Sequence, residues 1–452
     1  MSESRRKFIK QVAIATAGTY LGTMGMSAKS YARIIGSNDR VRLGVIGFSD
    51  RFKNSHIPSF MQHYKELNFD IVAVSDIWKL RREEGQAFLQ ENLAHKIKAC
   101  RNNEELYAIK DIDGVFVSTA DFQHALHAIE AVNANCDVYC EKPFAETMED
   151  ARAALKVVKA SDRIVQIGSQ RRSGANYKAA EQFIKSGQFG DINMVELSWN
   201  VNQPGRWRRP DLVAKLREED TDWKRFILNR PYEAFDARKY LEYRLFWPYS
   251  SGQPGQWMSH QIDTVHWFTD LKHPRSVTAN GGIYVWKDGR KNWDTTTAVF
   301  DYGKPDDPSN GFQVVFNSRM GNGDEHPAEI YYSNGGELNL ITNKISPKGG
   351  LTENMAKAMN MKANLLPEKD LAEMTIKVEA GANTGGDVLT SAHVRNWMEC
   401  IRSRKQPNAP VEAGYYHSIA NIMTNAAVRT GGKATFDEVT QEVMVEGKVF
   451  KY

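Results

Sequence analysis

Between residues 41 and 169 the chain alternates short runs of β-branched, apolar residues with segments whose apolar residues have helical spacing. This alternation is typical of a parallel sheet covered by helices on both faces and joined by right-handed crossovers. After a helical segment at 175–186, the strand-like runs become longer, with tight turns such as Asn334-Gly335-Gly336 between them. The sequence therefore predicts an α/β protein: an N-terminal doubly wound, Rossmann-type sheet, and a C-terminal α+β domain with a large, mostly antiparallel sheet.

The same patterns place the elements along the chain. The expected strands of the first sheet are 41–47, 71–75, 114–118, 138–141 and 164–167. Those of the second sheet are 192–199, 277–286, 295–302, 311–318, 329–332 and 337–341. Two helices, 394–403 and 415–430, are expected to close the chain. We expect one domain over 33–168 and a second over 169–452, with an irregular insertion at 351–385.

Composition limits the classes of partner. A chain of 452 residues exceeds what one hydrophobic core usually supports, which agrees with two domains. Its net charge of +4 is small against 59 basic and 55 acidic residues, and no basic run interleaved with aromatic residues occurs beyond the N-terminus. Nucleic acid is therefore not an expected partner. The four cysteines match neither a zinc site nor a disulfide framework, so we expect buried free thiols and no metal.

The N-terminus predicts export. Ser4-Arg5-Arg6-Lys7-Phe8-Ile9-Lys10 precedes a mildly apolar stretch at 12–26, and Ser30-Tyr31-Ala32 supplies small residues for cleavage. This order is typical of a twin-arginine signal, which we place at 1–32, and it indicates a periplasmic protein. The apolar stretch is too short and glycine-containing to give a stable membrane anchor. The alternative is a basic arm on a cytosolic protein.

The turn after the first expected strand is a weak dinucleotide signal. A pyrophosphate is bound by glycines that let backbone amides and a helix N-terminus approach it. In Gly47-Phe48-Ser49-Asp50-Arg51 only the first glycine is present. Asp50 would place negative charge near a phosphate, which Arg51 beside it would offset. A flavodoxin-like domain without a dinucleotide explains this turn equally well.

Other polar residues follow the neighbouring strands. Asp76 ends the second expected strand, where a carboxylate hydrogen-bonds an adenosine ribose and favours NAD over NADP. Its alternative role is the N-cap of the helix that begins near Trp78. Ser118, Thr119 and His124 offer hydroxyl and imidazole groups to the same crevice, although a capped helix start explains them too.

Glu141-Lys142-Pro143 closes the strand expected at 138–141. Because proline disfavours the helical region for the preceding residue, Lys142 is held extended at the end of the strand. An ammonium there can hydrogen-bond a substrate hydroxyl, stabilise a developing alkoxide and pass a proton. The alternative is a surface salt bridge between Lys142 and Glu141.

Over nearly its whole length after the signal, the chain resembles the Gfo/Idh/MocA family of glucose-fructose oxidoreductases and inositol dehydrogenases. The segments that carry this resemblance are 43–47, 138–143, 165–172, 187–190, 222–226 and 395–403. The resemblance implies that 33–168 binds NAD, with Glu141 and Lys142 at the cofactor. NADP is less favoured because of the carboxylate of Asp76. It also implies that Lys142 is catalytic, that the Lys142–Pro143 peptide is cis, and that 169–452 binds substrate and forms a homo-oligomer, a dimer or tetramer.

A second catalytic element of that family has the pattern Asp-x-Gly-x-His-x-x-Asp, which residues 256–263 resemble. The resemblance makes His260 the catalytic histidine, and its imidazole titrates near neutral pH. Asp263, one helical turn later, would orient His260 or contact sugar hydroxyls. Gln256 replaces the first carboxylate and cannot carry a proton, so the identity of the proton relay stays open. For His260 alone, a structural histidine is the alternative.

The second domain offers groups suited to carbohydrate. The residues expected to bind substrate are Gln170, Arg171, Arg172, Trp207, Gln256 and Trp257. Together with the resemblance, they predict an NAD-dependent oxidoreductase acting on a hydroxyl of a sugar, polyol or glycoside. Because no NAD pool is expected outside the inner membrane, the cofactor would be tightly held. One alternative is a redox-neutral, NAD-dependent glycoside hydrolase, and another is an exported carbohydrate-binding protein without catalysis.

Overall fold

The computed structural model describes residues 39–451 except 305–306, 308, 325–326 and 372–386. The signal predicted at 1–32 and the end of the predicted insertion, 372–385, lie outside the described residues. Val41–Tyr452 forms one compact unit. In the described part of the chain, no helix is both long and apolar enough to cross a membrane. The four cysteines are buried free thiols, as predicted.

Within the described residues, six parallel strands form the first sheet in the order β3-β2-β1-β4-β5-β6. Their bounds are β1 Val41–Ile46, β2 Phe69–Ser75, β3 Lys98–Cys100, β4 Gly114–Val117, β5 Asp137–Cys140 and β6 Val165–Ile167. The predicted Rossmann-type sheet is thus confirmed. β3 was missed because Lys98-Ala99-Cys100 contains no β-branched or aromatic residue, unlike β6, which has the same length.

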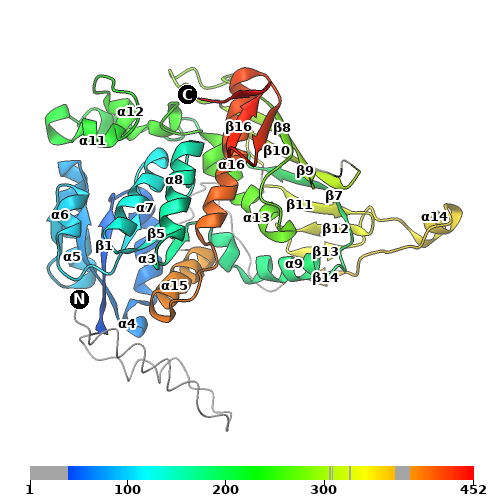
Figure 1. The fold of residues 1–452 in the computed structure, drawn as a ribbon, viewed down its shortest axis with the longest axis horizontal. Helices are drawn as coiled ribbons and strands as arrows, with labels where there is room; N and C mark the ends of the chain where they lie inside the picture. The colour runs from blue at the N-terminus through cyan, green and yellow to red at the C-terminus, as the bar shows by residue number, and fades with distance from the viewer. Residues whose placement is uncertain (1–38, 305–306, 308, 325–326, 372–386, 452) are drawn as a thin grey trace, which may run out of the picture. The chain divides into compact units, whose positions relative to one another are not determined.

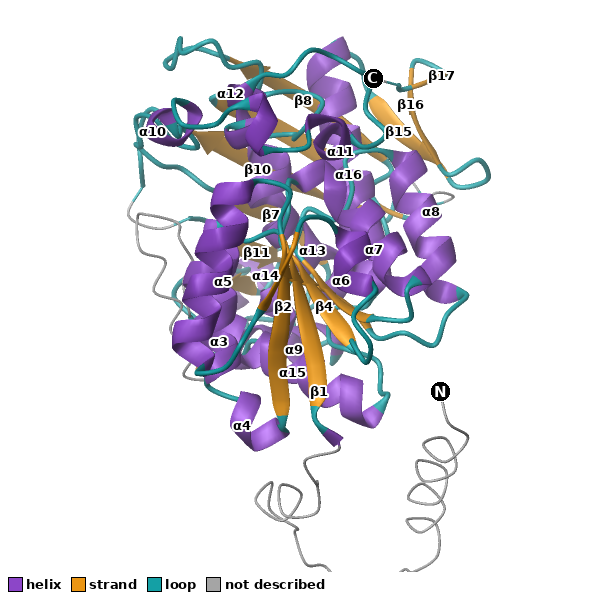
Figure 2. Cartoon of the chain, turned by 90° about the vertical axis from the view of Figure 1, so that its left-hand side faces the viewer, coloured by secondary structure: helices purple, strands orange, loops and turns teal. Residues whose placement is uncertain are grey.

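Helices cover both faces of this sheet (Figure 2). The helices are α3 Ile57–Met61, α4 Tyr64–Leu67, α5 Lys79–Leu93, α6 Asn103–Tyr107, α7 His124–Asn133, α8 Met148–Lys159 and α15 Val388–Ser403. On one face, Phe60 of α3 and Trp397 of α15 pack against Phe116 of β4. On the other face, the small residues of α7 and α8, such as Ala125 and Ala151, lie in a second buried cluster with the opposite side of the strands.

The second sheet is large and mostly antiparallel, as predicted. In the part of the chain that the structure describes it has eleven strands, ordered β14-β13-β12-β11-β7-β10-β9-β8-β15-β16-β17, of which β7 and β10 are paired in parallel. Strands predicted from sequence are β7 Ile192–Ser198, β8 Ser276–Gly282, β9 Thr295–Gly303, β10 Gly311–Arg319, β11 Glu329–Ser333 and β12 Gly336–Asn339. Strands that were not predicted are β13 Lys344–Ser346, β14 Lys369–Asp370, β15 Ala434–Asp437, β16 Glu442–Val445 and β17 Lys448–Val449.

The two sheets share helices that lie between them (Figure 1). The remaining helices are α9 Ala175–Lys185, α10 Pro210–Val213, α11 Trp223–Ile227, α12 Ala237–Leu241, α13 Ser259–Thr269, α14 Glu353–Ala358 and α16 Val411–Thr430. α16 contacts β6 of the first sheet and β8 of the second, and α13 packs on α16. α16 begins directly after Pro410, and α15 begins at Val388 because Asp387 caps it by accepting the Thr390 N–H. Both starts lie before the apolar pattern that predicted these helices.

Candidate active site

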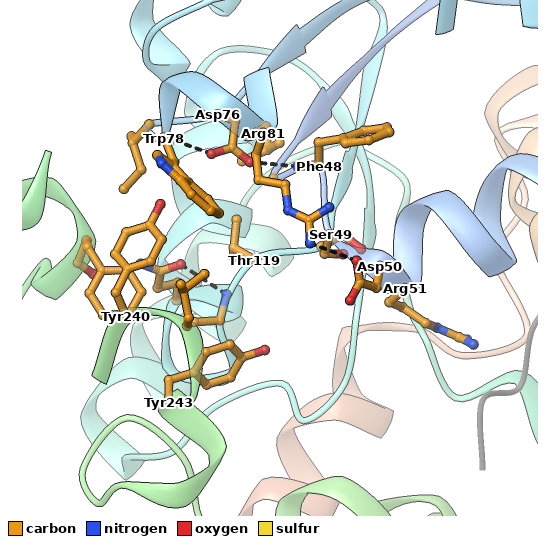
Figure 3. A pocket seen from close by; sticks show the side chains of 18 of the residues that line it. Phe48, Ser49, Asp50, Arg51, Asp76, Trp78, Arg81, Thr119, Tyr240 and Tyr243 are labelled. Carbon is orange, nitrogen blue, oxygen red and sulfur yellow. Dashed lines mark hydrogen bonds and ion pairs between the residues drawn. The ribbon is translucent and has the colours of Figure 1, made fainter. Parts of the chain in front are cut away.

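A pocket opens beyond the carboxyl ends of β1, β2 and β4, where the strand order reverses direction (Figure 3). In open parallel sheets this switch point is the usual ligand crevice. Six of the nine predicted cofactor residues line it: Gly47, Ser49, Arg51, Asp76, Ser118 and Thr119. The opposite wall comes from residues that follow β7 and includes Trp207, Arg209, Leu212, Tyr240, Tyr243 and Arg244. Of these, Trp207 was predicted to bind substrate.

Gly47 brings the first turn close to the end of β4. Its φ is +82°, and a Cβ atom there would lie 2.8 Å from Thr119 Cγ2 and 3.1 Å from the Ser118 carbonyl oxygen. A side chain would therefore fill the space between the two strand ends. The hydroxyls of Ser118 and Thr119 are buried without a hydrogen-bond partner among the described residues. They are available to a bound polar ligand.

Asp76 connects the segments that follow β1 and β2 by hydrogen bonds. One carboxylate oxygen accepts the Phe48 N–H and the other accepts the Trp78 N–H, each at 2.9 Å (Figure 3). α5 begins only at Lys79, with Trp78 as its N-cap, so Asp76 does not fill the N-cap role considered from sequence. Burial raises the pKa of Asp76, although the two backbone donors oppose this.

Asp50 is neutralised by residues other than its neighbour Arg51. Arg81 Nη2 lies 2.9 Å from one carboxylate oxygen of Asp50, and Arg209 Nη2 lies 3.4 Å from the other. Arg51 points away from Asp50 (Figure 3), and its Nε donates to Glu141 at 2.9 Å. The expectation that Arg51 offsets Asp50 is therefore wrong, because the ion pairs are set by tertiary neighbours from α5 and from the segment before α10.

Three predicted cofactor residues do not line this pocket. The buried Glu141 carboxylate accepts from Arg51, and His56 Nε2 lies 2.9 Å from it, so it does not pair with the Lys142 ammonium. Burial acts to raise the pKa of Glu141, but Arg51 and His56 outweigh it and hold that pKa well below its usual range. His124 is also buried, with Nδ1 2.7 Å from the Pro143 carbonyl oxygen.

Lys142 is the third of these residues, and its side chain reaches the helical turn that precedes α13. The Lys142–Pro143 peptide is cis, as the resemblance implied. The half-buried Nζ donates to the backbone carbonyl of Gln256 at 2.5 Å. Burial lowers the pKa of Lys142 to about 7, even though Glu141 and Asp121 act to raise it. Amine and ammonium are therefore both populated near neutral pH, which suits a group that exchanges protons.

His260 lies on α13, near Lys142, with 8% of its surface exposed. Its ring stacks on Trp199 with centroids 6.0 Å apart. Burial and then the positive charge of Lys142 hold the pKa of His260 well below its ordinary value, so the imidazole is neutral. Asp263 does not orient this ring: its two carboxylate oxygens accept from Arg172 Nε and Nη2 at 2.8 and 2.9 Å.

The side chain of Gln256 joins the two halves of the site. Its Oε1 accepts from Arg244 Nε at 2.8 Å, and its Nε2 donates to Asp121 Oδ2 at 2.6 Å. Asp121 is fully buried and also accepts from Ser250 Oγ at 2.6 Å. Sequence reasoning reached the turn that holds Asp121 but did not connect it with Gln256, which lies 135 positions later.

The six predicted substrate residues form two groups, of which the first is Gln170, Arg171 and Arg172. Arg171 is buried, forms an ion pair with Glu329, and lies over the rings of Tyr177 and Trp199 at 5.5 and 5.8 Å. Arg172 is held by Asp263, and Gln170 is buried. None of these three lines the pocket. The ion pairs of Arg171 and Arg172 are with β11 and α13.

Three tryptophans, Trp207, Trp257 and Trp199, form a continuous row of neighbouring rings. The ring centroids of Trp207 and Trp257 are 5.3 Å apart, and those of Trp257 and Trp199 are 6.2 Å apart with planes at 5°. The row therefore runs from Trp207 in the pocket wall to Trp199 beneath His260. Trp199 was missed because it follows β7 and reads as a strand residue. Among the side chains that the structure describes, no cluster of histidine, cysteine, aspartate and glutamate is placed to hold a metal ion.

Comparison with known proteins agrees with this geometry. Residues 41–169 match the family model GFO_IDH_MocA, described as an oxidoreductase family with an NAD-binding Rossmann fold. An inositol 2-dehydrogenase of Salmonella typhimurium is 31% identical over 166 residues, which are 36% of this chain and 48% of that protein. A 1,5-anhydro-D-fructose reductase of Ensifer adhaerens is 30% identical over 156 residues, 32% of this chain and 46% of that protein. The chain thus spans about half the length of these curated relatives.

The whole fold has solved counterparts. The crystal structure of the WlbA dehydrogenase from Bordetella pertussis in complex with NADH and UDP-GlcNAcA superposes with a TM-score of 0.61 at 17% identity. The match covers 88% of this chain and 98% of that one, so both sheets are shared. Residues 41–169 are thus similar to the GFO_IDH_MocA oxidoreductase family with its NAD-binding Rossmann fold.

Proposed function

We propose that this protein is an NAD-dependent oxidoreductase that acts on a hydroxyl of a sugar, polyol or glycoside. The observation that carries the proposal is Lys142, a half-buried lysine with a pKa of about 7 that lies beside a neutral His260 at the carboxyl end of the parallel sheet. The family match supports redox chemistry, and relatives that are inositol and anhydrofructose enzymes support a polyhydroxylated substrate.

The pocket suits a dinucleotide. Gly47 leaves room at the first turn, and the hydroxyls of Ser118 and Thr119 are unsatisfied where a ligand would pass. Each carboxylate oxygen of Asp76 has a second lone pair for a ribose hydroxyl, and its charge disfavours the 2′-phosphate of NADP. Bound NAD would supply the acceptor for a hydride from the substrate carbon.

The protein groups would handle the proton. As the carbon is oxidised, the neutral amine of Lys142 accepts the hydroxyl proton, because its pKa matches the operating pH. The Gln256 carbonyl holds Nζ in position through the 2.5 Å hydrogen bond. His260, kept uncharged by burial and by Lys142, serves as a hydrogen-bonding partner for a neighbouring substrate hydroxyl.

We further propose that the cofactor is tightly held and recycled in place in an exported protein. The support for retention is that some residues between 207 and 244, such as Trp207 and Tyr240, form the outer wall of the pocket and that Arg209 of this wall forms an ion pair with Asp50. The support for export is the N-terminal segment alone, and a homo-oligomer rests on the resemblance alone.

One experiment tests the reaction. The purified protein is first examined for bound dinucleotide by absorbance and mass spectrometry, then incubated with myo-inositol, sugars and aryl glycosides without added acceptor. We expect a keto product and reduced cofactor. Release of phenol without net reduction would instead show the redox-neutral glycosidase. Bound sugar without any turnover would favour a carbohydrate-binding protein, and absence of dinucleotide would rule out both enzymes.

The ion pair between Arg209 and Asp50 leads to a separate prediction about cofactor release. Arg209→Ala removes the 3.4 Å ion pair with Asp50, so bound NAD should dissociate about two to five times faster, as expected for a partly exposed pair worth up to about 1 kcal/mol. The release of NADH after dilution, followed by its fluorescence, measures this. Arg217→Ala, at an exposed position in the same segment, is the matched control. Equal rates of NADH release from the two variants would mean that the Arg209–Asp50 ion pair does not retain the cofactor.

A further inference from the structure

We infer that Asp121 is a positioning residue for Lys142. Its carboxylate fixes the side chain of Gln256, whose backbone carbonyl holds the lysine Nζ. It also supplies, near the amine, the carboxylate that is missing at residue 256. This inference rests on the proposed function for its consequences in catalysis. It stands on geometry that does not depend on the identity of the substrate.

Asp121 is well placed for this role. It begins the short helical turn Asp121–Gln123, which follows β4 after residues 118–120, and its side chain is fully buried. Oδ2 accepts from Gln256 Nε2 and from Ser250 Oγ, both at 2.6 Å, while Oδ1 lies 3.8 Å from Arg244 Nη2. The carboxylate therefore connects the segment after β4 with residues 244–256, which precede α13.

These contacts leave Gln256 a single orientation. Arg244 can only donate, so it requires the side-chain oxygen of Gln256, and Asp121 then receives the amide N–H. With the side chain held at both ends, the backbone carbonyl of Gln256 stays aimed at Lys142 Nζ, 2.5 Å away. Gln256 thus positions the lysine without itself exchanging a proton.

The charges around Lys142 identify Asp121 as the group to change. The ionisable groups that interact with Lys142 are Glu141, Asp121, Arg51, Arg244, His260 and His417. The charge of Glu141 is already shared with Arg51 and His56. The nearby Glu146 has its pKa raised to about 8, first by burial and then by Asp121, so it is mostly uncharged at neutral pH.

Asp121→Asn tests the inference, because it removes the charge and keeps an acceptor for Gln256. An anion favours the ammonium form, so its loss should lower the pKa of Lys142 from about 7 by about one unit. Labelling of Lys142 by acetic anhydride as a function of pH, read by peptide mass spectrometry on the full chain, reports this titration without any turnover. In activity assays, the acidic limb of hydroxyl oxidation should move to lower pH by the same amount.

Asp137→Asn is the matched control: this buried aspartate begins β5, pairs with Arg404, and should leave the titration of Lys142 unchanged. The double variant Asp121→Asn with Gln256→Glu returns a carboxylate to the pair and should restore the wild-type titration, which also tests the idea if Asp121→Asn does not fold. A folded Asp121→Asn protein with unchanged Lys142 titration, or a double variant whose lysine titrates below wild type, overturns the inference. A shifted titration in a protein that does not oxidise hydroxyls would leave the inference standing and refute the proposed function.

Discussion

Lys142→Met lowers kcat/KM for hydroxyl oxidation by about 10²- to 10⁴-fold, the usual contribution of a positioned proton acceptor. Methionine is unbranched and of similar length, so it keeps the packing at the end of β5 and removes the proton-exchanging group. NAD should still bind, because the pocket lining does not include Lys142. Steady-state kinetics and cofactor content measure the two effects. Lys156→Met on the exposed face of α8 is the matched control, with wild-type rates expected.

The same lysine sets the pH dependence. Oxidation needs the neutral amine, so kcat/KM should fall as the pH drops below about 7, whereas reduction of the carbonyl needs the ammonium and should fall as the pH rises above about 7. Profiles measured in both directions on the wild type should therefore show opposite limbs. Parallel limbs in the two directions, or a Lys142→Met enzyme of normal activity, would exclude Lys142 as the proton acceptor.

Arg171→Leu should lower the free energy of unfolding by about 3–5 kcal/mol, because it leaves Glu329 buried without its ionic partner. Burial raises the pKa of Glu329 while Arg171 opposes it, so loss of the arginine raises that pKa further and favours the protonated acid. Urea unfolding measures the change. Arg225→Leu, which breaks an exposed pair with Glu104, should cost about 1 kcal/mol or less.

A double variant distinguishes a stabilising role of the Arg171–Glu329 ion pair from the substrate-binding role that the sequence predicts for Arg171. Arg171→Leu with Glu329→Leu replaces both charges by apolar groups and should recover most of the lost stability. If Arg171 instead contacts the substrate, Arg171→Leu will raise KM with little change in unfolding. The structure favours a loss of stability, since Arg171 does not line the pocket.

Much of the fold could be predicted because its signals are local. The alternation of buried strands with helical spacing gave five strands of the first sheet, and longer runs gave six of the second. The two-residue strands β14 and β17 were missed because they are too short to show a period of two, and only their pairing with β13 and β16 defines them as strands. Helix starts were misplaced where a cap, such as Asp387, extends the helix beyond its apolar face.

The site residues also divide into those that a local pattern predicts and those whose partners are distant in the sequence. Lys142 and His260 were found because each follows from a short pattern that fixes its place at the end of a strand or on a helix. The partners of charged residues were not found: Asp50 pairs with Arg81 and Arg209, Asp263 with Arg172, and Arg171 with Glu329, 158 positions away. No local pattern encodes which distant charge will lie within 4 Å.

The sequence by itself determined the two-sheet α/β plan, the lysine at the end of β5 and the histidine on α13, since periodicity and proline act within a few residues. Only the tertiary structure decided the environment of these groups. Burial lowers the pKa of Lys142 to about 7, and the contact between Asp121 and Gln256 fixes the carbonyl that holds its amine. Desolvation and charge pairing depend on every element packed around a side chain, and those elements come from parts of the chain more than a hundred residues apart.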